Sequence, residues 1–169
     1  PVRVNHVTAG AEFGWRSGSA KWPSYYFDSL PASANIGRGS PTGVVFYHHN
    51  QFPSKYSDAF FISDWAQGEI LAVHMKRQGA TWKGDAEVFA TGNPLNVTDV
   101  EVGPDGALYF SCGGRGTEGG VFRIIHQSST EVAERTGIVE AAIQQPQPES
   151  AWGRHQLKHL RAQAGDTWG

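Results

Sequence analysis

Disulfides, membrane spans and a strong charge of either sign are missing from this chain of 169 residues. Its one cysteine, Cys112, cannot form a disulfide within the chain. No apolar run approaches the roughly 20 residues that a membrane-spanning helix needs. The formal net charge of −2 provides no basic surface for nucleic acid or an anionic membrane. We therefore expect a soluble domain with no nucleic-acid partner and no membrane span.

Glycine and proline are plentiful by contrast, with 21 and 9 copies that separate short, densely apolar segments. Residues 59–63 are followed by a glycine turn and a second apolar run, and residues 107–111 repeat this arrangement. The spacing of the two copies lies within the period of about 40 to 50 residues that is typical of repeated β-sheet units. Because such a unit buries one of its faces only against a neighbouring copy, the repeat predicts a β-propeller with its functional residues in loops.

Alternating apolar residues, bounded by turn residues, predict the strands of two successive blades. The first blade has strands at residues 44–47, 59–63, 70–75 and 86–91, and the second at residues 98–102, 107–111 and 121–125. The run Gly103-Pro104-Asp105-Gly106 predicts a tight hairpin turn with a positive φ at its last glycine. Since closed propellers typically have at least four blades, we expect this chain to form only part of one.

The propeller fragment is expected to span residues 1–126, with a short strand near its start and a long irregular connection over residues 11–42. Residues 127–148 are polar and end in glutamine and proline, which is typical of a linker. Residues 149–169 carry a serine suited to cap a helix, and we expect a helical segment there that starts a helical-repeat extension. The predicted fold class is therefore all-β, about two four-stranded antiparallel blades, followed by a linker and a short C-terminal helix.

Strand direction sorts the predicted loops onto two ends of the blades. In an antiparallel blade, the loop before the first strand and the loop between the second and third strands lie at the same end. This places residues 38–42, 63–68, 93–98 and 112–119 together, and with them Arg38, Thr42, Asp64, Trp65, Asn96, Thr98, Asp99 and Arg115. The opposite end receives residues 49–58, residues 77–85 and the Pro-Asp-Gly turn. We expect any ligand site in a central channel to lie at the first end.

Several segments together resemble the last part of a known six-bladed propeller. They are Ala11–Arg16, Gly37–Gly43, Tyr56–Gly68, Thr98–Phe110 and Gly113–Gly116. The propeller is that of the glucose/sorbosone dehydrogenase family, which binds pyrroloquinoline quinone (PQQ). The chain looks most like the large exported "membrane-bound dehydrogenase domain" proteins typical of Planctomycetes and Verrucomicrobia, which continue into HEAT-type helical repeats and often a haem c module. The resemblance implies a periplasmic oxidoreductase whose partners are the remaining blades, the helical and haem domains, and a sugar ligand.

The resemblance also assigns a cofactor site, and some residue types expected there are different in this chain. PQQ-binding relatives have an Arg-Ile-Arg-Asp-Val run, because the carboxylates of the quinone suit guanidinium groups, where this chain has Asn96–Val100. Their loop lysine has no counterpart in Asp64–Gln67, and their calcium-associated Asn-Tyr pair is replaced by Glu12-Phe13. By position, we assign cofactor contacts to Arg38, Thr42, Asn96, Thr98 and Arg115, and calcium contacts to Glu12 and the backbone of Phe13. The general base is expected in an earlier blade, outside this chain.

The same residues also have structural interpretations. An arginine in a glycine-rich loop, such as Arg38 or Arg115, commonly donates hydrogen bonds to loop carbonyls or a nearby carboxylate. Aspartates at strand ends commonly accept backbone N–H groups, and we favour that role for Asp64 and Asp99. Cys112 has no CxxC partner, so we expect it to be a small packed residue.

Two functions from different classes remain open. In the first, the parent protein is an oxidoreductase that acts on sugars or related alcohols through a quinone and passes electrons to haem. In the second, the propeller is non-catalytic and serves as a recognition or scaffold module for carbohydrate or protein. The missing arginines, lysine and tyrosine favour the second function, and the otherwise intact frame favours the first. In either case the chain alone is predicted to be inactive.

Overall fold

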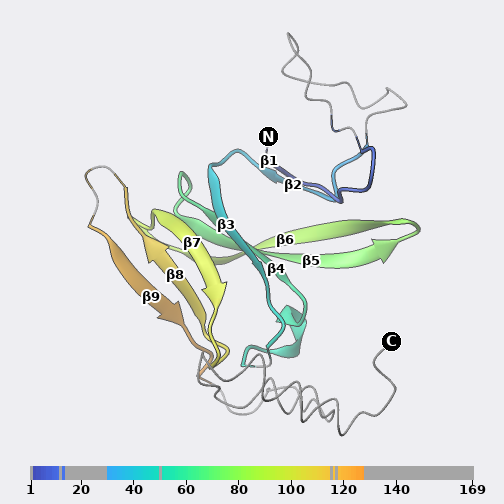
Figure 1. The fold of residues 1–169 in the computed structure, drawn as a ribbon. Coiled ribbons are helices and arrows are strands. Elements are labelled where there is room, and N and C mark those ends of the chain that lie inside the picture. The colour runs from blue at the N-terminus through green and yellow to red at the C-terminus, as the bar shows by residue number, and fades with distance from the viewer. Residues whose placement is uncertain are drawn as a thin grey trace, which may run out of the picture.

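The computed structural model describes residues 2–11, 13, 30–49, 51–114, 116 and 118–127. Within them the chain is all-β, apart from one short 3-10 turn, η1 (Ser54–Tyr56) (Figure 1). The strands are β1 (Val2–Val4), β2 (Ala34–Gly37), β3 (Pro41–Phe46), β4 (Phe60–Asp64), β5 (Glu69–Gln78), β6 (Thr81–Thr91), β7 (Val97–Val102), β8 (Leu108–Cys112) and β9 (Gly120–Ile124). No helix in this part of the chain is long and apolar enough to cross a membrane.

The strands form three antiparallel sheets, ordered β1-β2, β3-β4-β5-β6 and β7-β8-β9. Strands that follow one another in the sequence are neighbours in each sheet, as in propeller blades. β7 lies against β3 on one side of the central sheet, and β2 lies against β6 on the other (Figure 1). The predicted four-stranded blade and the three strands of the next blade are confirmed. No sheet closes on itself within the described residues, so the fold is that of a partial propeller.

The central sheet is apolar on both of its faces. Phe61 and Ile62 are adjacent in β4 and therefore point to opposite faces, yet both are buried. Phe61 belongs to the larger core, which is shared with β7 and β8, and Ile62 belongs to a smaller core shared with β2. A sheet of this kind needs a neighbour on each side, which is the physical reason for the continuous apolar runs in its middle strands.

Tyr47, just after β3, ties the central sheet to the turn between β7 and β8. Its hydroxyl donates a hydrogen bond to the carbonyl oxygen of Gly106 at 2.8 Å and accepts one from the backbone N–H of Phe52 at 3.1 Å. Its ring also stacks on that of Phe52, with 4.7 Å between the ring centroids. Gly106 has a φ of 78°, and a Cβ there would collide with the ring of His49. The predicted positive φ in this turn is confirmed, and glycine is required there for space as well.

Two expectations about the segments between strands are wrong. Residues 77–85 are not a loop, because β5 and β6 continue through them to a two-residue turn at Gly79, whose φ is 60°. This end of the hairpin carries mostly exposed polar residues, so it lacks the apolar alternation that marks a strand. The connection over residues 11–42 is not wholly irregular, because it contains β2. The predicted linker and C-terminal helix, from residue 128 onward, lie outside the described residues.

Candidate functional site

The loops predicted to share one end of the blades do meet there. We call this end the rim, and it comprises residues 38–42, 64–68, 93–98 and 112–114. Trp65 lies at its centre: its backbone N–H donates to Ser40 O at 3.0 Å, and its indole N–H donates to Gly113 O at 2.8 Å. Its own carbonyl accepts a hydrogen bond from Asn96 Nδ2 at 3.1 Å. One residue therefore joins its loop to the three others.

Asp64 fixes the rim from below, at the end of β4. Its side chain is only 2% exposed, and Oδ1 accepts hydrogen bonds from the backbone N–H groups of Ser40, Ala66 and Gln67 at 3.0, 2.9 and 2.9 Å. The other carboxylate oxygen lies so close to Gly39 that a Cβ at this glycine would collide with it. The interpretation of Asp64 as an acceptor for backbone N–H groups is thus confirmed, and its carboxylate faces the protein rather than a ligand.

Most residues predicted to contact a cofactor use their polar groups within the protein. The hydroxyl of Thr42 donates to Val97 O at 2.7 Å, which ties β3 to β7, and the amide of Asn96 is bound to Trp65. The Thr98 hydroxyl is paired with the Ser111 hydroxyl at 2.8 Å. Because the residues on either side of Ser111 pack into the core, Ser111 and Thr98 lie on the face of their sheet that points away from β3. The structure therefore brings Thr42 and Asn96 together at the rim and turns Thr98 away from them.

Arg38 is exposed at the rim, and among the described residues its guanidinium has no hydrogen-bond or ion-pair partner. Only its carbonyl is engaged, by Gln67 Nε2 at 3.1 Å. Phe13 is half-buried, and Glu12 and Arg115 lie outside the described residues. A quinone that carries several carboxylates needs several cations, and the described part of the rim offers one. No cluster of His, Cys, Asp or Glu suited to a metal occurs among the described residues either. By themselves, these residues do not fit PQQ or calcium.

Ionisable groups with displaced pKa values have structural roles. Burial raises the pKa of the Cys112 thiol, which packs beside the larger core, so this cysteine is not activated as a nucleophile. Burial also works to raise the pKa of Asp105, but hydrogen bonds from the backbone N–H of Ala107 and the hydroxyl of Tyr109 outweigh it and hold that pKa below its usual value. This carboxylate pins the turn between β7 and β8, at the end opposite the rim.

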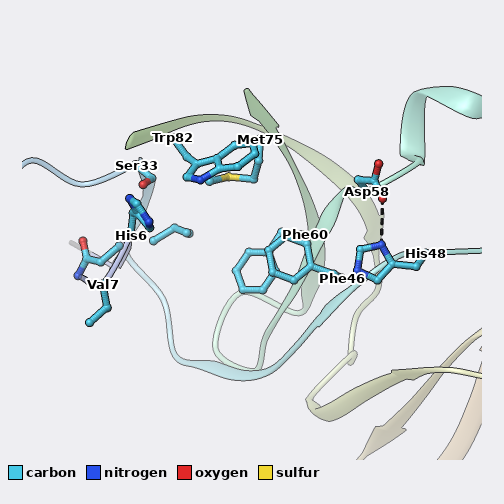
Figure 2. A pocket seen from close by; sticks show the side chains of 11 residues that line it. His6, Val7, Ser33, Phe46, His48, Asp58, Phe60, Met75 and Trp82 are labelled. Carbon is cyan, nitrogen blue, oxygen red and sulfur yellow. Dashed lines mark hydrogen bonds and ion pairs between the residues drawn. The ribbon is translucent and has the colours of Figure 1, made fainter. Parts of the chain in front are cut away.

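A concave region elsewhere in the structure was not predicted from the sequence. It is a cavity of about 620 Å³ beside the first residues of the chain, and Figure 2 shows its lining. Phe46 and Phe60 lie between Trp82 on one side and a hydrogen-bonded pair, His48 Nδ1 and Asp58 Oδ1 at 2.9 Å, on the other. Asp58 has a φ of 62°, which is unusual for a residue other than glycine. These residues lie far apart in the sequence and form no motif, so only the fold reveals the cavity.

Comparison with known proteins finds a likeness among solved structures. No protein-family model matches the chain, and no curated protein matches it. Among solved structures, it is similar to a protein of Thermus thermophilus described as "putative oxidoreductase (glucose dehydrogenase)", with a TM-score of 0.55 and 18% sequence identity. The chain shares the fold of that protein. The match covers 72% of this chain and 35% of the other, so the chain spans about a third of the length of that protein.

Proposed function

We propose that this chain is part of a β-propeller oxidoreductase that acts on sugars or related alcohols. The observation that carries the proposal is the likeness of its packed sheets to a structure described as a glucose dehydrogenase. The rim supports it, because loops from both blades converge there and Arg38 is exposed among them, where it can meet an anionic or hydroxyl-bearing ligand. Such loops, held by a rigid scaffold, are where binding residues are usually found.

In this proposal the intact protein is exported and uses a quinone of the PQQ type, with calcium, and electrons pass to a haem partner. The remaining blades and a helical extension would complete it. Because the described rim supplies a single cation, the groups that hold such a quinone would come from those other blades or from the undescribed residues, Arg115 and Glu12 among them. This chain would contribute Arg38 and the frame that positions it, and would be inactive alone.

A second function is favoured by one specific observation. The side chains of Thr42, Asn96 and Asp64 all form hydrogen bonds with backbone groups of neighbouring segments. Such bonds favour a rigid rim over one that holds a cofactor. A non-catalytic propeller that recognises carbohydrate or protein at this surface is therefore the alternative. Folds of this kind host unrelated functions, so the site and not the architecture must decide.

Titration of the full-length polypeptide separates the two functions. We would add PQQ with Ca²⁺, follow saturable binding by absorbance, and then measure glucose-dependent reduction of an artificial electron acceptor. Loss of the Arg38 guanidinium in R38A should weaken quinone or sugar binding by about tenfold, the effect of losing one charge-assisted hydrogen bond. The control is R77A, since Arg77 is an exposed arginine on β5 outside the rim. Saturable sugar binding without quinone binding would favour a carbohydrate-recognition module, and binding of neither would refute both the oxidoreductase and carbohydrate recognition.

A further inference from the structure

The cavity of about 620 Å³ beside β1 has the size and the lining of a site for a small organic molecule. Such sites typically have volumes of about 300 to 1,000 Å³ and are lined mainly by apolar and aromatic side chains. Here Phe46 and Phe60 form the floor, with 4.6 Å between their ring centroids, and Trp82 and Met75 stand at one side (Figure 2). The middle of the cavity therefore offers a surface for a flat ring.

One end of the cavity holds a fixed hydrogen-bond acceptor, which is the ring of His48. Its Nδ1 lies 2.9 Å from Asp58 Oδ1, and the ring stacks on Phe46 with 5.9 Å between the centroids (Figure 2). An ionised carboxylate only accepts hydrogen bonds, so Nδ1 carries the proton and Nε2 of the neutral ring is an acceptor. Within the described part of the chain, this Nε2 has no hydrogen-bond partner. A molecule bound here would meet it with a donor.

The other end of the cavity holds polar atoms that lack a partner. Ser33 is 6% exposed, and its hydroxyl makes no hydrogen bond with any described residue (Figure 2). The same is true of Oδ1 of Asn5, which also lines the cavity. Buried polar atoms are normally paired. A hydroxyl group bound at this end would supply a partner for Ser33 after rotation about one side-chain bond.

We propose that this cavity binds a flat aromatic molecule of the phenol class, with a hydroxyl group at each end. Its rings would lie on Phe46 and Phe60. One hydroxyl would donate to His48 Nε2, and the other would pair with Ser33. A sugar fits less well, because hydroxyl groups surround its ring and the apolar middle of the cavity has no partners for them.

The cavity is a site separate from the rim. His48 and Asp58 lie just after β3 and just before β4, at the end of these strands opposite the rim. Their side chains are 65% and 71% exposed. A protein layer that closed this end would have to desolvate the Asp58 carboxylate, which is costly, so we expect the end to stay open in the intact protein. The inference therefore does not rest on the proposed function.

The test measures the binding of two biphenyl probes to the full-length polypeptide by isothermal titration calorimetry. One probe has a hydroxyl group at each end, and the other has methoxy groups, which cannot donate. The hydroxyl probe should bind at least about tenfold more tightly. H48F keeps a ring beside Phe46 but removes the acceptor, so it should weaken the hydroxyl probe about tenfold and leave the methoxy probe unchanged. F46A removes part of the floor and should weaken both probes.

The matched control is H74F, because His74 is also paired with a carboxylate, that of Glu87, but does not line this cavity. It should leave the affinity of both probes unchanged. Each other result would overturn the proposal. No saturable binding would show that protein fills the cavity, and equal affinity of the two probes would show that hydroxyl groups are not recognised. Equal effects of H48F and H74F would place the binding elsewhere, and displacement of the hydroxyl probe by glucose would make this a sugar site.

Discussion

Replacement of Asp64 by alanine removes the acceptor that holds three backbone N–H groups of the rim. Asp64 is 2% exposed as a residue, and the three hydrogen bonds of its carboxylate span 2.9 to 3.0 Å. A hydrogen bond to a charged group contributes about 1.5 to 3 kcal/mol, but these three are not additive, and the donors lie on exposed residues that water can reach. We therefore expect D64A to lower the free energy of unfolding by about 3 kcal/mol. D64N keeps one acceptor oxygen and should cost about 1 kcal/mol.

Urea unfolding measures this loss as a lower midpoint at an unchanged slope, which separates reduced stability from a change in the unfolded state. The control is D85A, because Asp85 is an exposed carboxylate in the middle of β6, away from the rim. Its loss should change stability by less than about 0.5 kcal/mol. Unfolding of D64A at the same urea concentration as D85A would show that the Asp64 carboxylate does not stabilise the rim.

Three further predictions concern the contacts between the blades and the turn below them. G43A should lower the free energy of unfolding by about 2 kcal/mol, because the added Cβ would lie 2.5 to 2.7 Å from atoms of β7. G113A is the control: its added Cβ would meet its nearest neighbour at 3.9 Å, so the urea midpoint should stay unchanged. W65F removes the indole N–H that reaches the β8–β9 loop and should lower stability by about 1 kcal/mol, again read from the urea midpoint. The pKa of Asp105 in the folded protein lies below its ordinary value of 3.8. Ionised Asp105 therefore stabilises the folded state above pH 3.8, and this contribution is lost as the pH falls through the folded-state pKa. D105N should therefore flatten the acid limb of a stability–pH profile, and an unaltered limb would contradict this assignment.

The core strands could be predicted from the sequence because their buried residues are apolar. Phe61 and Ile62 are both apolar, and the runs that contain them end at glycine turns, which is sufficient to place β4 and β5. The role of Asp64 followed from its place at a strand end, where a carboxylate meets free backbone N–H groups.

Other features leave no such signal. The position of Trp65 at the centre of the rim depends on a carbonyl of Gly113, and every residue type has a carbonyl. Thr98 turns away from the rim because the pairing register shifts between Val97 and Asp99. Such a bulge changes which face of the sheet a side chain points to, and no particular residue type marks it in the sequence. The outer half of the β5-β6 hairpin was missed because most of its residues are exposed and polar, so they show no apolar alternation.

β3 of one blade lies directly against β7 of the next, and the packing of the two blades depends on this contact. The most direct measurement is the nuclear Overhauser effect between the α-protons of Gly43 and the amide proton of Val100. A Cβ built on Gly43 would lie 2.6 Å from the Val100 nitrogen, so one α-proton points at that amide. We predict a strong cross-peak, comparable with those between the paired residues Phe61 and Ala72 inside the central sheet. Its absence, with the peaks inside the sheet present, would contradict the packing of the two blades.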